Sequence, residues 1–162
     1  MIIVYAPEGG TKEAFEVARG KLRASEIQII ERTADARWND IKEAVSEGDL
    51  NAMRTVVWVL KKREQPSLRF AEFDPFEGDL YSRLDEREVR AYAEGFVEKY
   101  RADPDTLAEA FDELRESAYD REGAEAVIAD VTAPKAPAPA EPQPEAAPAQ
   151  EATETAPSPT AS

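Results

Sequence analysis

The sequence predicts a mainly α-helical protein, with one compact domain of about four helices, a small N-terminal β-hairpin and a disordered C-terminal tail. Apolar residues recur every three or four positions over long stretches, as in helices that bury one side. A period of two occurs near the N-terminus. We divide the chain into a hairpin or strand-like segment (1–24), a helical domain (25–131) with its core at 25–74 and a second helical part at 85–120, and a tail (132–162).

The N-terminal segment is predicted to form a β-hairpin. Residues 2–5 are rich in β-branched side chains, the glycine pair 9–10 suits a turn, and residues 14–18 include an alternating apolar and acidic stretch. A helix over residues 11–22 is the alternative. We prefer the hairpin because Gly20 would weaken such a helix.

A first helix is predicted from Ser25 to about Val45. Ser25 is a good N-cap, and Gln28 completes a capping box. Gly48 accepts the left-handed conformation that often follows the end of a helix. The predicted buried side consists of Ile27, Ile30, Ala34, Trp38, Ile41 and Val45.

Asp49 is predicted to cap a second helix. Because the link to the first helix is short, the two form either close antiparallel neighbours or a tight corner. Three cations, at 61–63, lie in the last turn of the second helix, where they meet the negative end of the helix dipole. Pro66 prevents simple continuation. An aromatic hook, Leu68, Phe70 and Phe73, follows in a short helical turn from Ser67. The buried side of this helix is predicted to be Leu50, Met53, Val56, Val57 and Leu60.

Two more helices are predicted after a loop at 75–79. The third helix spans about 85–101 and has one apolar side. The fourth spans about 103–119 and begins with Asp103 as cap and Pro104 at the first helical position. Residues 120–131 contain an apolar patch, and the sequence leaves open whether they are ordered.

The tail and the charge of the chain limit the class of function. Eight of the 12 prolines lie in 132–162, where no aromatic or large aliphatic side chain is available to form a core. A net charge of −14 opposes binding to nucleic acid or to an anionic membrane. We expect neither as a partner.

The residue types present argue against an enzyme. The chain has no histidine and no cysteine, so the commonest general base and the strongest side-chain nucleophile are missing. Acidic pairs such as Glu109 and Glu113 are interpreted as solvated helix faces, and Gly9–Gly10 as a turn. We expect no catalytic residue, no cofactor and no metal site.

Aromatic residues are the candidates for contact with a partner. Trp38 is predicted to lie in the core, whereas Trp58 suits either the rim of the core or a partner-binding groove. A second aromatic stripe in the third helix either covers the first two helices or exposes a groove that binds a helix. Its members are Tyr92, Phe96 and Tyr100, together with Phe111.

Part of this pattern resembles a known family. The motifs are L-R-A-S-E-I-Q-I-I-E at 22–31, the tryptophan at 38, E-G-D-L-N-A at 47–52, and V-V-W-V-L-K-K-R-E-Q-P-S-L-R-F-A-E-F-D at 56–74. They are similar to the tail assembly chaperones of long-tailed (siphovirus-type) bacteriophages, in particular phages of actinobacteria. The resemblance covers about a third of the chain.

The resemblance implies a nonenzymatic protein of the infected host cell's cytoplasm, absent from the mature virion. Such chaperones bind the tape measure protein, keep it soluble and help deliver the major tail-tube protein onto it. A longer form made by ribosomal frameshifting is usual in the family, and self-association is plausible for such chaperones. The rival hypotheses are an acidic inhibitor or adaptor of a host protein and a minor structural virion protein.

These expectations combine in one site hypothesis. We expect an apolar groove on the second helix and the hook to receive amphipathic segments of the tape measure protein, with a basic rim. The predicted partner-binding residues are Trp58, Leu60, Lys61, Arg63, Phe70 and Phe73.

Overall fold

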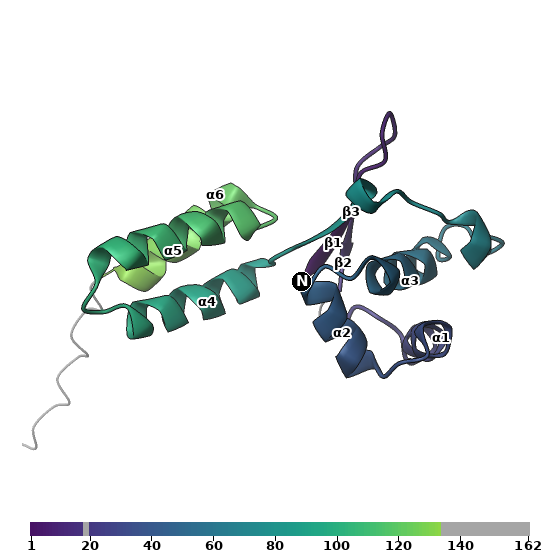
Figure 1. The fold of residues 1–162 in the computed structure, drawn as a ribbon, viewed down its shortest axis with the longest axis horizontal. Coiled ribbons are helices and arrows are strands. Elements are labelled where there is room, and N and C mark those ends of the chain that lie inside the picture. Colours follow the sequence, from purple (N-terminus) through teal and green to yellow (C-terminus); the bar gives the residue numbers. More distant parts are fainter. Residues whose placement is uncertain (18–19, 134–162) are drawn as a thin grey trace, which may run out of the picture.

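The computed structural model describes residues 1–17 and 20–133, which form six α-helices and a three-stranded sheet (Figure 1). The predicted class, mainly α-helical with a small β-structure at the N-terminus, is confirmed. Six helices replace the expected four because one predicted helix is divided and residues 121–132 are helical. Residues 134–162, which make up nearly all of the predicted tail, lie outside the described residues.

The predicted hairpin is present, and the alternative helix over 11–22 is wrong. Strands β1 (Ile2–Tyr5) and β2 (Glu13–Glu16) pair antiparallel. A third strand, β3 (Leu80–Arg83), pairs with the other edge of β1, so the order is β2-β1-β3. β3 was not predicted, because its residues L-Y-S-R include no β-branched side chain and no short turn links them to another apparent strand. This strand exists because β1 offers it an edge.

The first predicted helix is two helices, α1 (Ala24–Ala34) and α2 (Trp38–Ser46). Asp35 ends α1 in the left-handed conformation, with φ of 50°. Glu31 Oε1 then accepts a hydrogen bond from the backbone N–H of Trp38, 2.8 Å away, at the start of α2. The sequence contains neither glycine nor proline at this break, so the usual signals of a helix end are missing.

The start of α1 also differs from the prediction. The N-cap is Arg23, and Ser25 lies inside the helix, so the Ser25–Gln28 capping box is wrong. The carboxylate of Glu26 accepts the Arg23 N–H at 2.7 Å instead. This places an acidic group at the positive end of the helix dipole.

Helix α3 (Leu50–Lys61) begins as predicted. It ends earlier than predicted, because Lys62 is the C-cap and only Lys61 of the three cations lies in the last turn. Asp49 caps it by accepting the N–H of Ala52 at 2.7 Å, and Gly48 precedes the cap with φ of +88°. The helix is buried on nearly all sides between the sheet, α1 and α2. The hook contains a short 3₁₀ helix, η1 (Phe70–Glu72), and a second one, η2 (Glu77–Asp79), precedes β3.

The second group contains α4 (Glu86–Lys99), α5 (Pro104–Ser117) and α6 (Arg121–Thr132). Asp103 followed by Pro104 begins α5, as predicted, and Asp85, at the approximate predicted start of the third helix, caps α4. Residues 120–131, left open by the sequence, are ordered as α6 and its cap Asp120. A short bridge between Leu84 and Ala118 holds the end of α5 beside the chain that leaves β3.

Buried side chains form two hydrophobic clusters, whereas the sequence predicted one compact domain with a single core. The first cluster joins the sheet, α1, α2, α3 and the hook, and the second joins α4, α5 and α6. Figure 1 shows the two groups on either side of the extended chain after β3. We call them the sheet lobe (residues 1–83) and the helical lobe (residues 84–133).

Candidate partner-binding cleft

The predicted groove residues Trp58 and Phe70 lie together, but they contact their own chain. Their rings meet edge to face, with centroids 5.2 Å apart. Trp58 Nε1 donates a hydrogen bond to the carbonyl oxygen of Leu68 at 3.1 Å, and only 9% of the residue is exposed. Arg54 covers the Phe70 ring at 4.3 Å. Both aromatic rings therefore help hold the hook onto α3.

The two other apolar residues of the predicted groove are buried. Leu60 is 6% and Phe73 is 5% exposed, and both belong to the cluster of the sheet lobe. Phe73 packs edge to face on Tyr5, with centroids 5.3 Å apart. These side chains stabilise the lobe from inside.

The cations of the predicted rim form ion pairs within the sheet lobe. Lys61 Nζ lies 2.6 Å from Glu13 Oε1 on β2, and Arg63 Nε lies 2.7 Å from Glu26 Oε1 on α1. The sequence predicted that these cations lie at the end of a helix, and it did not predict their acidic partners. The structure thus brings Trp58 and Phe70 into contact, whereas Lys61, Arg63 and Phe73 contact other parts of the sheet lobe and Leu60 is buried in its cluster. Their role in binding a partner stays a prediction.

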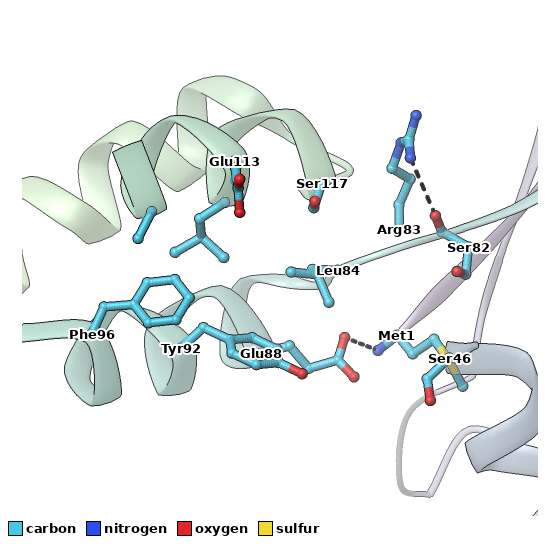
Figure 2. A pocket seen from close by; sticks show the side chains of 12 residues that line it. Met1, Ser46, Ser82, Arg83, Leu84, Glu88, Tyr92, Phe96, Glu113 and Ser117 are labelled. Atoms are coloured by element: carbon cyan, nitrogen blue, oxygen red, sulfur yellow. Dashed lines mark hydrogen bonds and ion pairs between the residues drawn. The ribbon is translucent and has the colours of Figure 1, made fainter. Parts of the chain in front are cut away.

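An open cleft of about 460 Å³ lies instead between α4 and α5 at the side of the helical lobe that faces the sheet lobe (Figure 2). Tyr92 and Phe96 reach into it from α4, and Glu113 and Ser117 border it from α5. Its full lining is Met1, Ser46, Ser82, Arg83, Leu84, Glu88, Tyr92, Phe96, Ala110, Glu113, Leu114 and Ser117. We call this site the interlobe cleft.

Aromatic side chains make the wall on α4. The ring centroids of Tyr92 and Phe96 are 6.1 Å apart, and those of Phe96 and Tyr100 are also 6.1 Å apart. Tyr92 is 50% exposed, whereas Phe111 is 7% exposed in the core of the helical lobe. The stripe was predicted either to cover the first two predicted helices or to expose a groove. In the structure it does not cover those helices, and it forms a partly exposed aromatic surface on α4.

One end of the cleft is closed by an ion-pair cluster. The Met1 ammonium contacts the carboxylates of Asp85 and Glu88, the latter at 2.7 Å. Burial alone would raise the pKa of Asp85. Hydrogen bonds from the Met1 ammonium and from the Glu88 N–H, with the charge of the ammonium, hold that pKa below its ordinary value. This end of the cleft is therefore polar and charged, whereas the α4 wall is apolar.

The aromatic wall of the cleft was predictable from the sequence, and the rest of the cleft was not. Leu84, Glu113 and Ser117 line the same cleft as Tyr92 because α5 packs along α4 and its end is hydrogen-bonded to Leu84. The spacing of aromatic residues along α4 signals the wall. No comparable signal marks the residues from the sheet lobe, because they are distant in the chain.

The described residues contain no cluster of three or more histidine, cysteine, aspartate or glutamate side chains placed to hold a metal ion. In the same residues, no helix combines the length and the apolar character needed to cross a membrane. Comparisons with protein-family models, with curated proteins and with solved structures gave no match. The interlobe cleft is therefore interpreted from its own geometry.

Proposed function

We propose that this protein is a nonenzymatic tail assembly chaperone, which binds the tape measure protein of a long-tailed phage in the cytoplasm of the infected cell. It keeps that protein soluble and promotes assembly of tail-tube subunits around it. The observation that supports the proposal best is the interlobe cleft, whose aromatic wall is open on a chain without histidine or cysteine. An apolar surface of this kind suits a protein partner.

The resemblance of residues 22–74 supports the same proposal from the sequence. A chaperone of this kind needs an apolar surface for the partner and enough charge to keep the complex soluble. The net charge of −14 meets the second need. Because the groove residues of α3 are packed within the sheet lobe, we assign the main contact to the interlobe cleft.

Coexpression with the tape measure protein tests this function. The parent chain should increase the soluble amount of tape measure protein several-fold, and Tyr92→Ser with Phe96→Ser should remove most of that increase. Phe76→Ser is the matched control, because Phe76 is 79% exposed and does not line the cleft. Circular dichroism of each variant verifies folding. A parent chain that leaves the tape measure protein insoluble contradicts the proposal.

The same experiment compares the cleft with the site predicted from sequence. Trp58→Ala and Phe70→Ala remove the rings that hold the hook onto α3, so we expect lower stability of the sheet lobe. If folded variants of these two residues lose solubilisation while Tyr92→Ser with Phe96→Ser keeps it, the partner binds at the hook, and the assignment to the cleft is wrong.

An acidic inhibitor or adaptor of a host protein is the second candidate. The distribution of charge favours it, since residues 84–133 contain 15 acids and six bases. Affinity purification from infected cells separates the two candidates. A tail assembly chaperone recovers tape measure or tail-tube protein, whereas an inhibitor recovers a host enzyme.

A further inference from the structure

We propose that the interlobe cleft binds a cationic amphipathic helix, whose apolar side packs on Tyr92 and Phe96 and whose lysine or arginine side chains face α5. This inference rests on the proposed function, because the helix would be a segment of the chaperoned protein. It specifies the chemistry of that segment and its orientation in the cleft.

The apolar wall sets the shape of the ligand. Rings at 92, 96 and 100 recur once per helical turn along α4, with successive centroids 6.1 Å apart. Tyr92 and Phe96 line the cleft, and Tyr100 lies one turn beyond them at the end of α4. From Tyr92 to Tyr100 this row of rings extends over about 12 Å at 1.5 Å per residue. Leu84 and Leu114 continue the apolar lining between the walls. A second helix with apolar residues every three or four positions matches this spacing.

The opposite wall sets the charge of the ligand. Glu109, Glu113 and Glu116 lie at positions i, i+4 and i+7 of α5, so they share one side of that helix. All three are exposed, and none of them forms an ion pair within residues 1–17 and 20–133. Glu113 itself lines the cleft (Figure 2). We call these three residues the α5 acidic stripe.

Two positive groups also lie at the cleft, and each already has contacts. The Met1 ammonium is paired with Asp85 and Glu88. The Arg83 guanidinium stacks on the Tyr81 ring at 4.8 Å and donates a hydrogen bond to the carbonyl oxygen of Ser82. Figure 2 shows the Arg83 side chain directed away from Tyr92 and Phe96. The acidic stripe therefore remains the charged group available to a ligand that lies along α4 and α5.

The net negative charge of the helical lobe also favours a cationic ligand. Residues 84–133 contain 15 acids and six bases, whereas residues 1–83 contain 15 acids and 13 bases. Arg90 and Arg115, two of the six bases, are paired with acids of the same lobe. Such an excess attracts cationic ligands over about 10 Å at moderate salt and repels anionic ones. A second copy of this chain is therefore a poor occupant.

Binding of two synthetic peptides to the full chain tests the proposal by calorimetry. One peptide of ~18 residues forms an amphipathic helix with leucine and phenylalanine on one side and lysine beside them, and the other has glutamate in place of every lysine. The lysine peptide should bind at least about 10-fold more tightly than the glutamate peptide. Its affinity should fall with rising salt.

Variants locate the binding. Glu109→Gln, Glu113→Gln and Glu116→Gln together should weaken the lysine peptide about 10-fold and reduce the salt dependence, and Tyr92→Ser should weaken it to a similar extent. The matched control is Glu86→Gln, Glu94→Gln and Glu98→Gln, which removes the same charge from exposed positions of α4 that do not line the cleft. This control should bind nearly as the parent does.

Three results would overturn the inference. These are equal binding of both peptides, equal weakening by the α5 and α4 triple variants, and displacement of the lysine peptide by a peptide of residues 133–150. The last result would assign the cleft to the chain's own C-terminal segment. If the α5 variant still solubilises the tape measure protein as well as the parent, the inference fails while the proposed function stands. A parent chain that solubilises nothing refutes the function itself.

Discussion

Glu26 is the clearest case of a residue whose role depends on partners far away in the chain. Its carboxylate accepts hydrogen bonds from Arg63 Nε at 2.7 Å and Nη2 at 2.8 Å, and from the Arg23 N–H. The hydrogen bonds from Arg63 are the largest cause that lowers the pKa of Glu26 from 4.5 to about 2, against the opposing effect of burial. This pair joins the start of α1 to the end of α3.

The first prediction concerns this ion pair. A lowered pKa stabilises the folded state above the unfolded-state value of 4.5, and the contribution is lost as the pH falls toward about 2. Arg63 is 41% exposed, so we discount the effect to about 1–2 kcal/mol. Glu26→Gln should lower the free energy of unfolding by that amount at neutral pH, and urea unfolding at several pH values measures it.

The pH dependence identifies the cause. The difference between parent and Glu26→Gln should shrink steadily between pH 4.5 and about 2. Glu43→Gln is the control, since Glu43 is exposed on α2 and forms no ion pair in the described part of the chain. A difference that stays constant over this pH range would show that packing, and not charge, makes Glu26→Gln unstable.

At the scale of elements, local signals predicted most helix ends, and their failures have physical causes. Asp49 and Asp103 cap helices as expected, because a cap needs only the next few residues. The break between α1 and α2 was missed because Asp35 adopts the left-handed conformation in place of glycine. The prediction of which residues face inward was still correct in part, since Ile30, Ile41 and Val45 are fully or almost fully buried.

The second prediction compares two glycines with equal space around them. A Cβ at Gly48 or at Gly95 would meet no atom within 4 Å, but only Gly48 has a positive φ, +88°. Gly48→Ala should therefore lower the free energy of unfolding by about 1–2 kcal/mol. Gly95→Ala, within α4, should raise it by about 0.5–1 kcal/mol. Thermal unfolding followed by circular dichroism measures both, and changes of the same sign would contradict the argument.

At the scale of the whole molecule, the two clusters predict two parts that unfold at different denaturant concentrations. Both tryptophans belong to the sheet lobe, with Trp58 inside its cluster and Trp38 packed against it. The lobes meet through the Met1 ion pairs, the chain around Leu84 and Lys12 over the Tyr119 ring, and the two apolar clusters remain separate. Tryptophan fluorescence therefore reports the sheet lobe, whereas far-ultraviolet circular dichroism reports helices of both.

The third prediction uses these two probes. Ile128 is 4% exposed in the helical lobe, so Ile128→Ala should lower the stability of that lobe by about 2–4 kcal/mol. The urea midpoint seen by circular dichroism should fall, while the midpoint seen by fluorescence should change much less. Ile30→Ala, in the sheet lobe, is the converse control. Coincident midpoints in both variants would show one cooperative unit.

The sequence alone determined where most elements lie and which side of each helix is apolar, because periodicity, caps and turn residues act over a few neighbouring positions. The tertiary structure decided the pairing of β3, the division of the core, and which aromatic residues remain exposed. Trp58 is covered by the chain that follows α3, and Phe73 packs on Tyr5 of β1. Tyr92, in contrast, stays open beside α5. Exposure depends on what the rest of the chain covers, and that depends on contacts between residues that are distant in the sequence.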